Sequence, residues 1–256
     1  MKAVIVAILI FAIGSVSPQP VLCAEPERES TVKRFIKVVE SNDRTAIANL
    51  VSYPLHREVP LPRIDTPEQF LQRFDEVLDE ELLKAIINSS IADDWAEVGW
   101  RGTMFKNGRL WLDADGKITA INYQTEKEKR ARARLIEADK RDLHVSLQRY
   151  VEPVLEWKTN DYRIRIDRTG KGRYRYAAWP LQKTTSEKPD LVLDNGELFF
   201  DGSGGNHHYD FKNGAVLYRC TVNVIGADDT PSGYLEVYKN NKVILSQPVI
   251  EVIKGR

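Results

Sequence analysis

Cysteine is scarce in this chain, and its scarcity limits the covalent framework of the fold. The 256 residues contain two cysteines, Cys23 and Cys220. Cys23 lies in an N-terminal segment that we expect to be removed, which leaves Cys220 alone and excludes an intramolecular disulfide. Cys220 falls in an alternating apolar segment, which predicts a small buried residue rather than a reactive thiol. The fold must therefore be held by its cores, and a chain of this length can bury two modest ones.

The chain also lacks an excess of charge of either sign. Lys plus Arg and Asp plus Glu number 37 each. Such a balance provides no global field that would attract nucleic acid or an acidic membrane. The mixed charges are typical of a soluble surface, and we expect no nucleic-acid partner.

Long apolar runs are missing except at the N-terminus. After Lys2, residues 3–13 are uniformly apolar, and Ala24 precedes a charged segment. This layout is typical of a secretory signal peptide, and the run is about half of the ~20 residues that cross a bilayer. We therefore expect cleavage after Ala24 and an exported chain, periplasmic or extracellular, without a transmembrane anchor. The alternative is a lipoprotein acylated on Cys23, although Leu22 is not the small residue that lipid-attachment motifs place there.

The first half of the chain predicts helices followed by strands. Apolar residues recur at helical spacing in four segments: 32–39, 46–51, 70–78 and 82–87. The period changes to two near Trp95, and Asn107-Gly108 predicts a tight hairpin. A third strand is predicted over 117–123.

Four features of this half together carry a family resemblance. They are the leading helix, the break at 51–55, the helix start at 66–70 and the strand pair within 100–111. On these features residues 30–123 resemble the nuclear-transport-factor-2-like superfamily, the cystatin-like α+β cone. The resemblance implies a curved sheet wrapped by helices around a pocket. Some members of that superfamily are isomerases, cyclases or dehydratases, whereas many only bind or scaffold.

An enzyme of this superfamily places an Asp or a His inside its pocket as an acid or base. His56 and Asp94 are the nearest residues of those types here. Each is also explained as a solvated or capping polar residue, so the sequence assigns no catalytic residue.

Residues 125–144 predict a charged helix that connects two domains. Gly and Pro are absent from 125–143. Acid–base pairs recur, such as Glu128 with Arg132, each worth about 0.2–0.5 kcal/mol. A basic arm is the alternative, since 127–134 holds five cations. Interleaved acids and the lack of aromatic residues favour a solvated connector.

Short strands separated by turn signals dominate the rest of the chain and predict an antiparallel β-sandwich or barrel. Turns are predicted at Thr169-Gly170-Lys171-Gly172, Asn195-Gly196, Asn213-Gly214 and Asn240-Asn241. The expected fold class is α+β, with helices packed on a curved antiparallel sheet, then the charged helix, then the β domain. The expected order is a signal peptide at 1–24, the cone domain at 25–124, the helix at 125–144 and the β domain at 145–256.

Four arginines form the first candidate binding surface. They lie on two adjacent predicted strands, where they alternate with Tyr and Ile: Arg163, Arg165, Arg173 and Arg175. If the strands pair in register, the four share one face with nothing acidic on it. Such a face could bind a phosphate, a carboxylate or an anionic polysaccharide. The alternative is an exposed face on which the arginine stems cover apolar surface.

A glycine-rich segment, 201–211, is the second candidate. Its candidate partner-binding residues are Ser203, Asn206, His207, His208 and Tyr209. No helix follows the glycines, as a phosphate-binding loop requires, and adjacent strand residues face opposite ways, so only His208 and Asp210 could share a metal. No metal is therefore expected. A bulged loop tied down by Asn206 is the simpler interpretation.

A loop that inserts into a partner protein is the other interpretation of this segment. Ser203-Gly204 followed by Tyr209 is faintly similar to the loop that periplasmic lysozyme inhibitors present to their enzyme. The spacing is longer here, and the disulfide of those inhibitors cannot form.

The sequence therefore favours an exported binding protein of the cell envelope that uses no cofactor. Its expected partner is an unidentified protein or an anionic envelope ligand. The alternatives are an isomerase- or hydrolase-like enzyme that uses the cone pocket, and an inhibitor of a cell-wall hydrolase that uses the glycine-rich loop.

Overall fold

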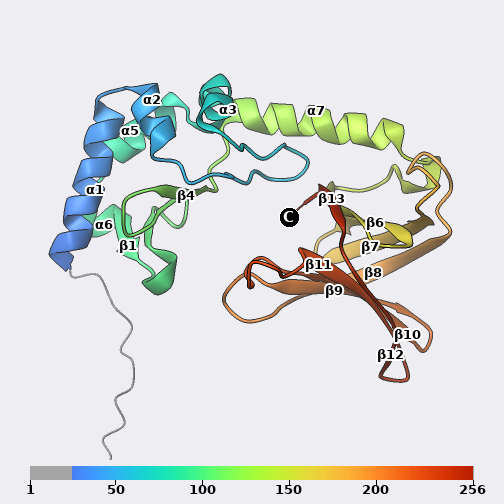
Figure 1. Ribbon diagram of the computed structural model, residues 1–256. Coiled ribbons are helices and arrows are strands. Elements are labelled where there is room, and N and C mark those ends of the chain that lie inside the picture. Colours follow the sequence, from blue (N-terminus) through green and yellow to red (C-terminus); the bar gives the residue numbers. More distant parts are fainter. Residues whose placement is uncertain (1–24, 256) are drawn as a thin grey trace, which may run out of the picture.

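The computed structural model describes residues 25–255, so the predicted signal peptide at 1–24 lies outside the described residues. The helices gather at one end of the molecule and a large sheet lies at the other, with one long helix between them (Figure 1). We call residues 25–124 the N-terminal unit and residues 145–255 the β unit. The predicted α+β class is confirmed.

One long helix and five short ones open the N-terminal unit. Their bounds are α1 (Glu25–Glu40), α2 (Arg44–Asn49), α3 (Pro67–Gln72), α4 (Phe74–Val77), α5 (Glu80–Ile87) and α6 (Ile91–Asp94). The carboxylate of Asp43 caps α2, the hydroxyl of Thr66 caps α3 and the carboxylate of Asp79 caps α5, each by accepting backbone N–H groups of the first turn. These caps explain why the helices begin where the polar residues stand.

A four-stranded antiparallel meander completes this unit. The strands are β1 (Trp95–Glu97), β2 (Thr103–Phe105), β3 (Leu110–Leu112) and β4 (Ile118–Ile121), in the order β1-β2-β3-β4. Alternation along the strands directs Phe105, Leu110 and Ile118 into the helices, while Trp111 lies on the opposite face. The interior is packed with apolar side chains, among them Phe35, whose ring meets that of Trp95 edge-on at 5.8 Å.

The β unit is one nine-stranded antiparallel sheet. Its strands are β5 (Glu152–Lys158), β6 (Tyr162–Gly170), β7 (Arg173–Pro180), β8 (Leu191–Phe200), β9 (His207–Asn213), β10 (Val216–Val222), β11 (Gly233–Lys239), β12 (Lys242–Pro248) and β13 (Glu251–Lys254). The spatial order is β12-β11-β10-β9-β8-β7-β6-β5-β13. The sheet curls strongly into a half-barrel. Of the two predicted architectures, the two-sheet sandwich is therefore wrong and the barrel-like one is nearer.

The chain between β12 and β13 connects the two edges of the curled sheet. The backbone N–H of Val249 donates to the carbonyl of Gly233 on β11 at 2.9 Å, and that of Ile250 donates to Lys158 on β5 at 2.9 Å. The concave face encloses a second apolar core, in which Trp157 and Phe211 are fully buried. This core holds Cys220 as well, so the predicted burial of that residue is confirmed.

The turn predicted at Asn195-Gly196 is wrong. The strand β8 runs through both residues, and Asn195 has φ +61° at a point where the register with β7 shifts. The two residues therefore form a bulge in a long strand. The first part of β8 pairs with β7, and the part after the bulge pairs with β9. A β-carbon on Gly196 would lie 2.1 Å from the ring of Phe211, which explains why glycine occupies this position. The other three predicted turns are present between consecutive strands, at residues 171–172, 214–215 and 240–241.

The helix α7 (Glu126–Asp142) connects the two units as predicted, and most of its residues are exposed, but Glu128 and Ile136 are buried against the units. Near its start, Glu128 is completely buried and receives hydrogen bonds from Arg57 at 2.7 and 2.5 Å. Near its end, Ile136 packs with Leu147 and Trp179. Both ends of α7 are thus fixed, one to each unit. The predicted pair of Glu128 with Arg132 is replaced by this longer-range ion pair.

Candidate functional site

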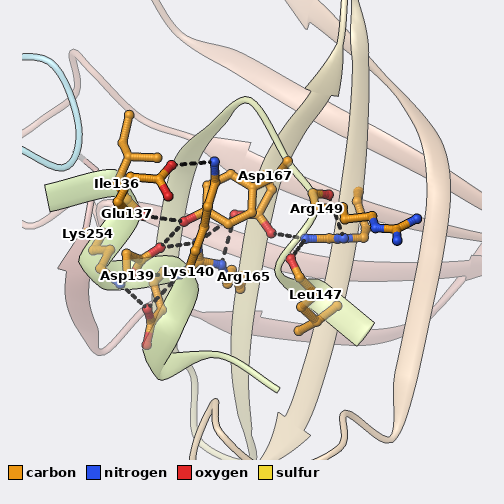
Figure 2. Close-up of polar contacts among 12 residues, drawn as sticks. Ile136, Glu137, Asp139, Lys140, Leu147, Arg149, Arg165, Asp167 and Lys254 are labelled. Atoms are coloured by element: carbon orange, nitrogen blue, oxygen red, sulfur yellow. Dashed lines mark hydrogen bonds and ion pairs between the residues drawn. The ribbon is translucent and has the colours of Figure 1, made fainter. Parts of the chain in front are cut away.

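The predicted arginine surface exists as a shared face, but it is neither open nor free of acids. Strand pairing places Arg163 opposite Trp179, and Asp167 opposite Arg175, so the predicted register is confirmed. Glu156 and Asp167 lie in the same cluster, and the end of α7 covers it (Figure 2). The expectation of an exposed, acid-free surface is therefore wrong.

Arg165 lies at the centre of this buried cluster, with none of its surface exposed. Its Nε donates to Asp167 at 2.8 Å, and its Nη2 donates to Asp139 of α7 at 2.5 Å. A third carboxylate, that of Glu156, lies 3.5 Å from Nη1. All the nitrogens of this guanidinium therefore face carboxylates of the protein, and the contact with Asp139 holds the helix to the sheet.

The other three arginines have intramolecular partners too. Arg175 is buried and donates to Asp167 at 2.7 Å and to the carbonyl of Leu147 at 2.6 Å. Arg163 donates to Glu156 at 2.9 Å. Arg173 is exposed and donates to Asn195 at 2.8 Å. The cluster is therefore part of the scaffold rather than an anion site.

The carboxylate of Asp139 is hydrogen-bonded by side chains from outside its own helix. Its carboxylate accepts hydrogen bonds from Arg165, from Lys254 of β13 and from the hydroxyl of Tyr150 (Figure 2). Burial raises the pKa of Asp139, but the hydrogen bonds and charge of Arg165, with those of Lys254 and Tyr150, outweigh burial and lower the pKa to about 2.

The glycine-rich segment forms the bulged loop that its simpler interpretation predicts. Asn206 accepts hydrogen bonds from the N–H groups of Val224 at 2.8 Å and Ile225 at 2.9 Å, and it donates to the Ile225 carbonyl at 3.0 Å. The carbonyl of Ser203 accepts a hydrogen bond from Arg101 of the N-terminal unit at 2.8 Å. The loop therefore bridges the two units.

The remaining candidates of this segment diverge to two faces. His208 lies 3.0 Å from Asp201 and stacks on Phe199, with a ring separation of 5.3 Å. His207 and Tyr209 face the other way, toward the cavity described next. Within residues 25–255, no three His, Cys, Asp or Glu side chains come together as a metal site.

The larger cavity of interest lies between the two units and has a volume of about 1010 Å³. The N-terminal unit contributes residues 56–63, which include Pro60 and Pro62, together with Asp65. The β unit contributes the rim and concave face of the half-barrel, and α7 contributes Arg132. The β-unit side chains that give this cavity its apolar and aromatic wall are Val154, Leu155, Tyr174, Tyr209, Val222, Val252 and Ile253.

Most charges around this cavity are paired with each other. Glu152 accepts a hydrogen bond from Arg132 at 2.6 Å and another from Arg168 at 2.6 Å. Arg63 lies 2.7 Å from Asp65. The cavity therefore combines apolar walls with a rim of ion pairs, an arrangement typical of ligand sites.

A second cavity, of about 590 Å³, lies beside the first along the β unit. It is bounded by Trp100 and by the outer face of the β1–β4 sheet on one side, and by Gly204, Val224 and Ile225 on the other. Gly204 and Val224 line the smaller cavity, and His207 and Val222, which belong to the same two segments of the chain, line the larger one. The two cavities thus adjoin, and we call them together the interunit groove.

His56 and Asp94 do not come together as an acid–base site. His56 lines the larger cavity of the groove. Asp94 ends α6 and lies 3.6 Å from Lys106, in the turn between β2 and β3. Neither residue belongs to the apolar interior of that unit. Apolar side chains form a buried core between the helices and the meander, and the two cavities are lined by other residues.

Sequence reasoning missed the residues that define the groove. Trp100 stands on a short 3-10 turn between Gly99 and Gly102, and a large aromatic residue flanked by glycines was the available signal. The prolines at positions 60 and 62 were the signal for the extended segment that forms one wall.

Comparison with known proteins identifies no relative: no family model, no curated protein and no solved structure matches this chain.

Proposed function

We propose that this chain is an exported binding protein of the cell envelope that holds its ligand in the interunit groove and uses no cofactor. The layout of residues 1–24 supports export. Within residues 25–255 no helix is both long and apolar enough to cross a membrane. The observation that carries the proposal of binding is the cavity of about 1010 Å³ lined by both units.

A rigid connection between the units supports a preformed site. At one end of α7, the ion pair between Arg57 and Glu128 has almost no exposed surface. At the other end, Arg165 and Asp139 connect the helix to β6. A site whose walls are fixed before the ligand arrives loses less conformational entropy on binding. The helix therefore fixes the distance between the two units, and with it the width of the groove.

The groove supports binding better than catalysis. The walls carry aromatic and apolar side chains, whereas the arginines of the rim are engaged by Glu152 and Asp65. His56 and Asp94, the two candidates for acid–base work, lie on different elements. We therefore favour a binding protein over an isomerase- or hydrolase-like enzyme.

Two measurements test this proposal. Cell fractionation with N-terminal sequencing is expected to find a chain that begins near Glu25 outside the cytoplasm. Recovery of the chain in the cytosol with residues 1–24 attached would contradict export.

The second measurement concerns the groove. Protein purified from the envelope fraction is denatured, and the released small molecules are identified by mass spectrometry. The variant Val252→Trp, which fills the larger cavity from β13, is expected to release less ligand. Val145→Trp, at an exposed position outside the groove, is the matched control. Equal release from both variants would contradict binding in the groove.

A further inference from the structure

Trp100 is the exposed exception among the described tryptophans. The residue is 71% exposed, whereas Trp111 is half-buried and Trp95, Trp157 and Trp179 are exposed by 2% or less. Leaving a large apolar ring in water forgoes the free energy of its burial. An exposed aromatic residue that borders a cavity therefore indicates a role in ligand binding rather than in packing.

The backbone holds Trp100 in a fixed position. Gly102 donates its N–H to the carbonyl of Gly99, and its own carbonyl accepts from Val98 at 2.9 Å, which closes the turn that carries the ring. A β-carbon on Gly102, which has φ +88°, would lie 2.1 Å from the carbonyl oxygen of Leu112. Only glycine allows this close approach. The indole is thus displayed on a rigid turn.

The smaller cavity offers a second indole and polar groups beside this ring. Trp111 of β3 lies on the outer sheet face, and Thr119 of β4 stands next to it. Among residues 25–255, the structure records no hydrogen-bond partner for the carboxylate of Glu97 or for the indole N–H of Trp100 or Trp111. These groups remain available to a ligand. Flat apolar rings and free donors and acceptors therefore meet in one cavity.

We infer that the smaller cavity is a binding site for a neutral glycan chain, with Trp100 as the stacking platform. This inference rests on the proposed function, since it names the ligand class of the same groove. A pyranose ring presents apolar C–H groups on its faces and hydroxyls around its edge. The faces fit the indoles, and the hydroxyls fit the carboxylate of Glu97 and the indole N–H groups.

The charge of the cavity favours a neutral sugar over an anionic one. Its lining contains three carboxylates, those of Glu27, Glu97 and Asp113, and two guanidinium groups. One of these, on Arg101, already donates to the Ser203 carbonyl. An anionic polysaccharide would meet the unpaired carboxylate of Glu97. This site thus differs from the anionic ligand that the sequence suggested.

The groove also accommodates a chain rather than a single sugar. The two cavities border the same two segments of the β unit, with Gly204 and Val224 in the smaller one and His207 and Val222 in the larger one. The second cavity adds Tyr174 and Tyr209 as further aromatic surface. A glycan of several units would therefore contact both, with its affinity increasing with length.

Titration of the full-length chain with soluble tetrasaccharides tests the inference. Cellotetraose, maltotetraose and the β-1,4-linked tetramer of N-acetylglucosamine are the probes, followed by calorimetry and by tryptophan fluorescence. We expect saturable binding of at least one of them. The variant Trp100→Ala is expected to weaken that binding about tenfold or more, because stacking on the indole is lost. The ring is exposed, so this variant should fold normally.

A matched aromatic control is available on the same unit as the glycine-rich loop. Phe200 is 69% exposed and does not line the smaller cavity, so Phe200→Ala should bind like the parent. Failure of all three sugars to bind, or equal binding by Trp100→Ala and Phe200→Ala, would overturn the glycan inference. The proposed function would survive that result if the envelope-purified protein released a different molecule that Val252→Trp excludes. Cytosolic recovery would contradict export without affecting the titration.

Discussion

The carboxylate of Asp139 on α7 accepts two hydrogen bonds from the guanidinium of Arg165 on β6, at 2.5 and 3.2 Å. This pair joins the connecting helix to β6, the third strand from one edge of the curled sheet (Figure 2). Arg165 is buried and has two further acidic neighbours, Asp167 and Glu156. The orientation of the helix, and with it the wall of the groove, depends on this contact.

Replacement of Asp139 by Asn should destabilise the β unit by about 3 kcal/mol at pH 7, because one partner of a buried ion pair is lost. The folded-state pKa of about 2 lies below the ordinary value of 3.8. The stabilisation is therefore fully present above pH ~4 and is lost as the pH falls through about 2. Urea unfolding at pH 7, 4 and 2.5 should show a stability difference between parent and variant that is nearly unchanged at pH 4 and clearly smaller at pH 2.5. Glu137→Gln, an exposed neighbour on the helix, is the control and should change little.

The pair of Glu128 with Arg57 leads to a second prediction. Glu128→Gln should cost about 3–5 kcal/mol, because a guanidinium with 2% exposed side-chain surface loses its countercharge. Glu126→Gln on the same helix turn removes an exposed pair with Lys129 and should leave the melting temperature nearly unchanged. Thermal unfolding of the two variants provides the comparison. Equal melting temperatures would show that the buried pair does not hold the helix to the N-terminal unit.

The bulge in β8 predicts a third effect. Gly196→Ala would place a methyl group inside the contact distance of the Phe211 ring, and such overpacking should destabilise the β unit by about 1–3 kcal/mol. Gly170→Ala, where the structure leaves open space around the new methyl group, is the matched control. Denaturant midpoints of the two variants test the prediction. A midpoint for Gly196→Ala that matches the control would contradict the bulge geometry.

The order of elements and most hairpin turns could be predicted from the sequence, because both depend on local spacing. The turn at Asn240-Asn241 shows why, since both residues adopt the positive φ that Asn tolerates. The same preference of Asn and Gly for positive φ led to the wrong prediction of a turn at Asn195-Gly196. A hairpin turn and a bulge both require a positive φ, and the difference depends on whether β7 and β9 lie on either side of the strand.

The site was less predictable, because it depends on contacts between distant residues. Alternation placed Arg165 and Arg175 on one face correctly, but it could not reveal that α7 covers that face. The partner of Arg165, Asp139, belongs to a helix predicted to be solvated. Likewise the exposure of Trp100 follows from how the N-terminal unit faces the glycine-rich loop. Periodicity describes one element at a time, and the groove is formed by two units.

The thiol of Cys220 provides the last prediction. The residue is completely buried on β10, and burial raises the pKa of its thiol well above the ordinary range. Both effects suppress the thiolate, which is the reactive form. In a Cys23→Ser variant, labelling by a disulfide reagent at pH 8 should therefore be at least about 1000-fold slower in the native state than in urea, since modification requires the β unit to open. Rapid stoichiometric labelling of the folded chain would show that the half-barrel core opens readily, contrary to a rigid wall for the groove.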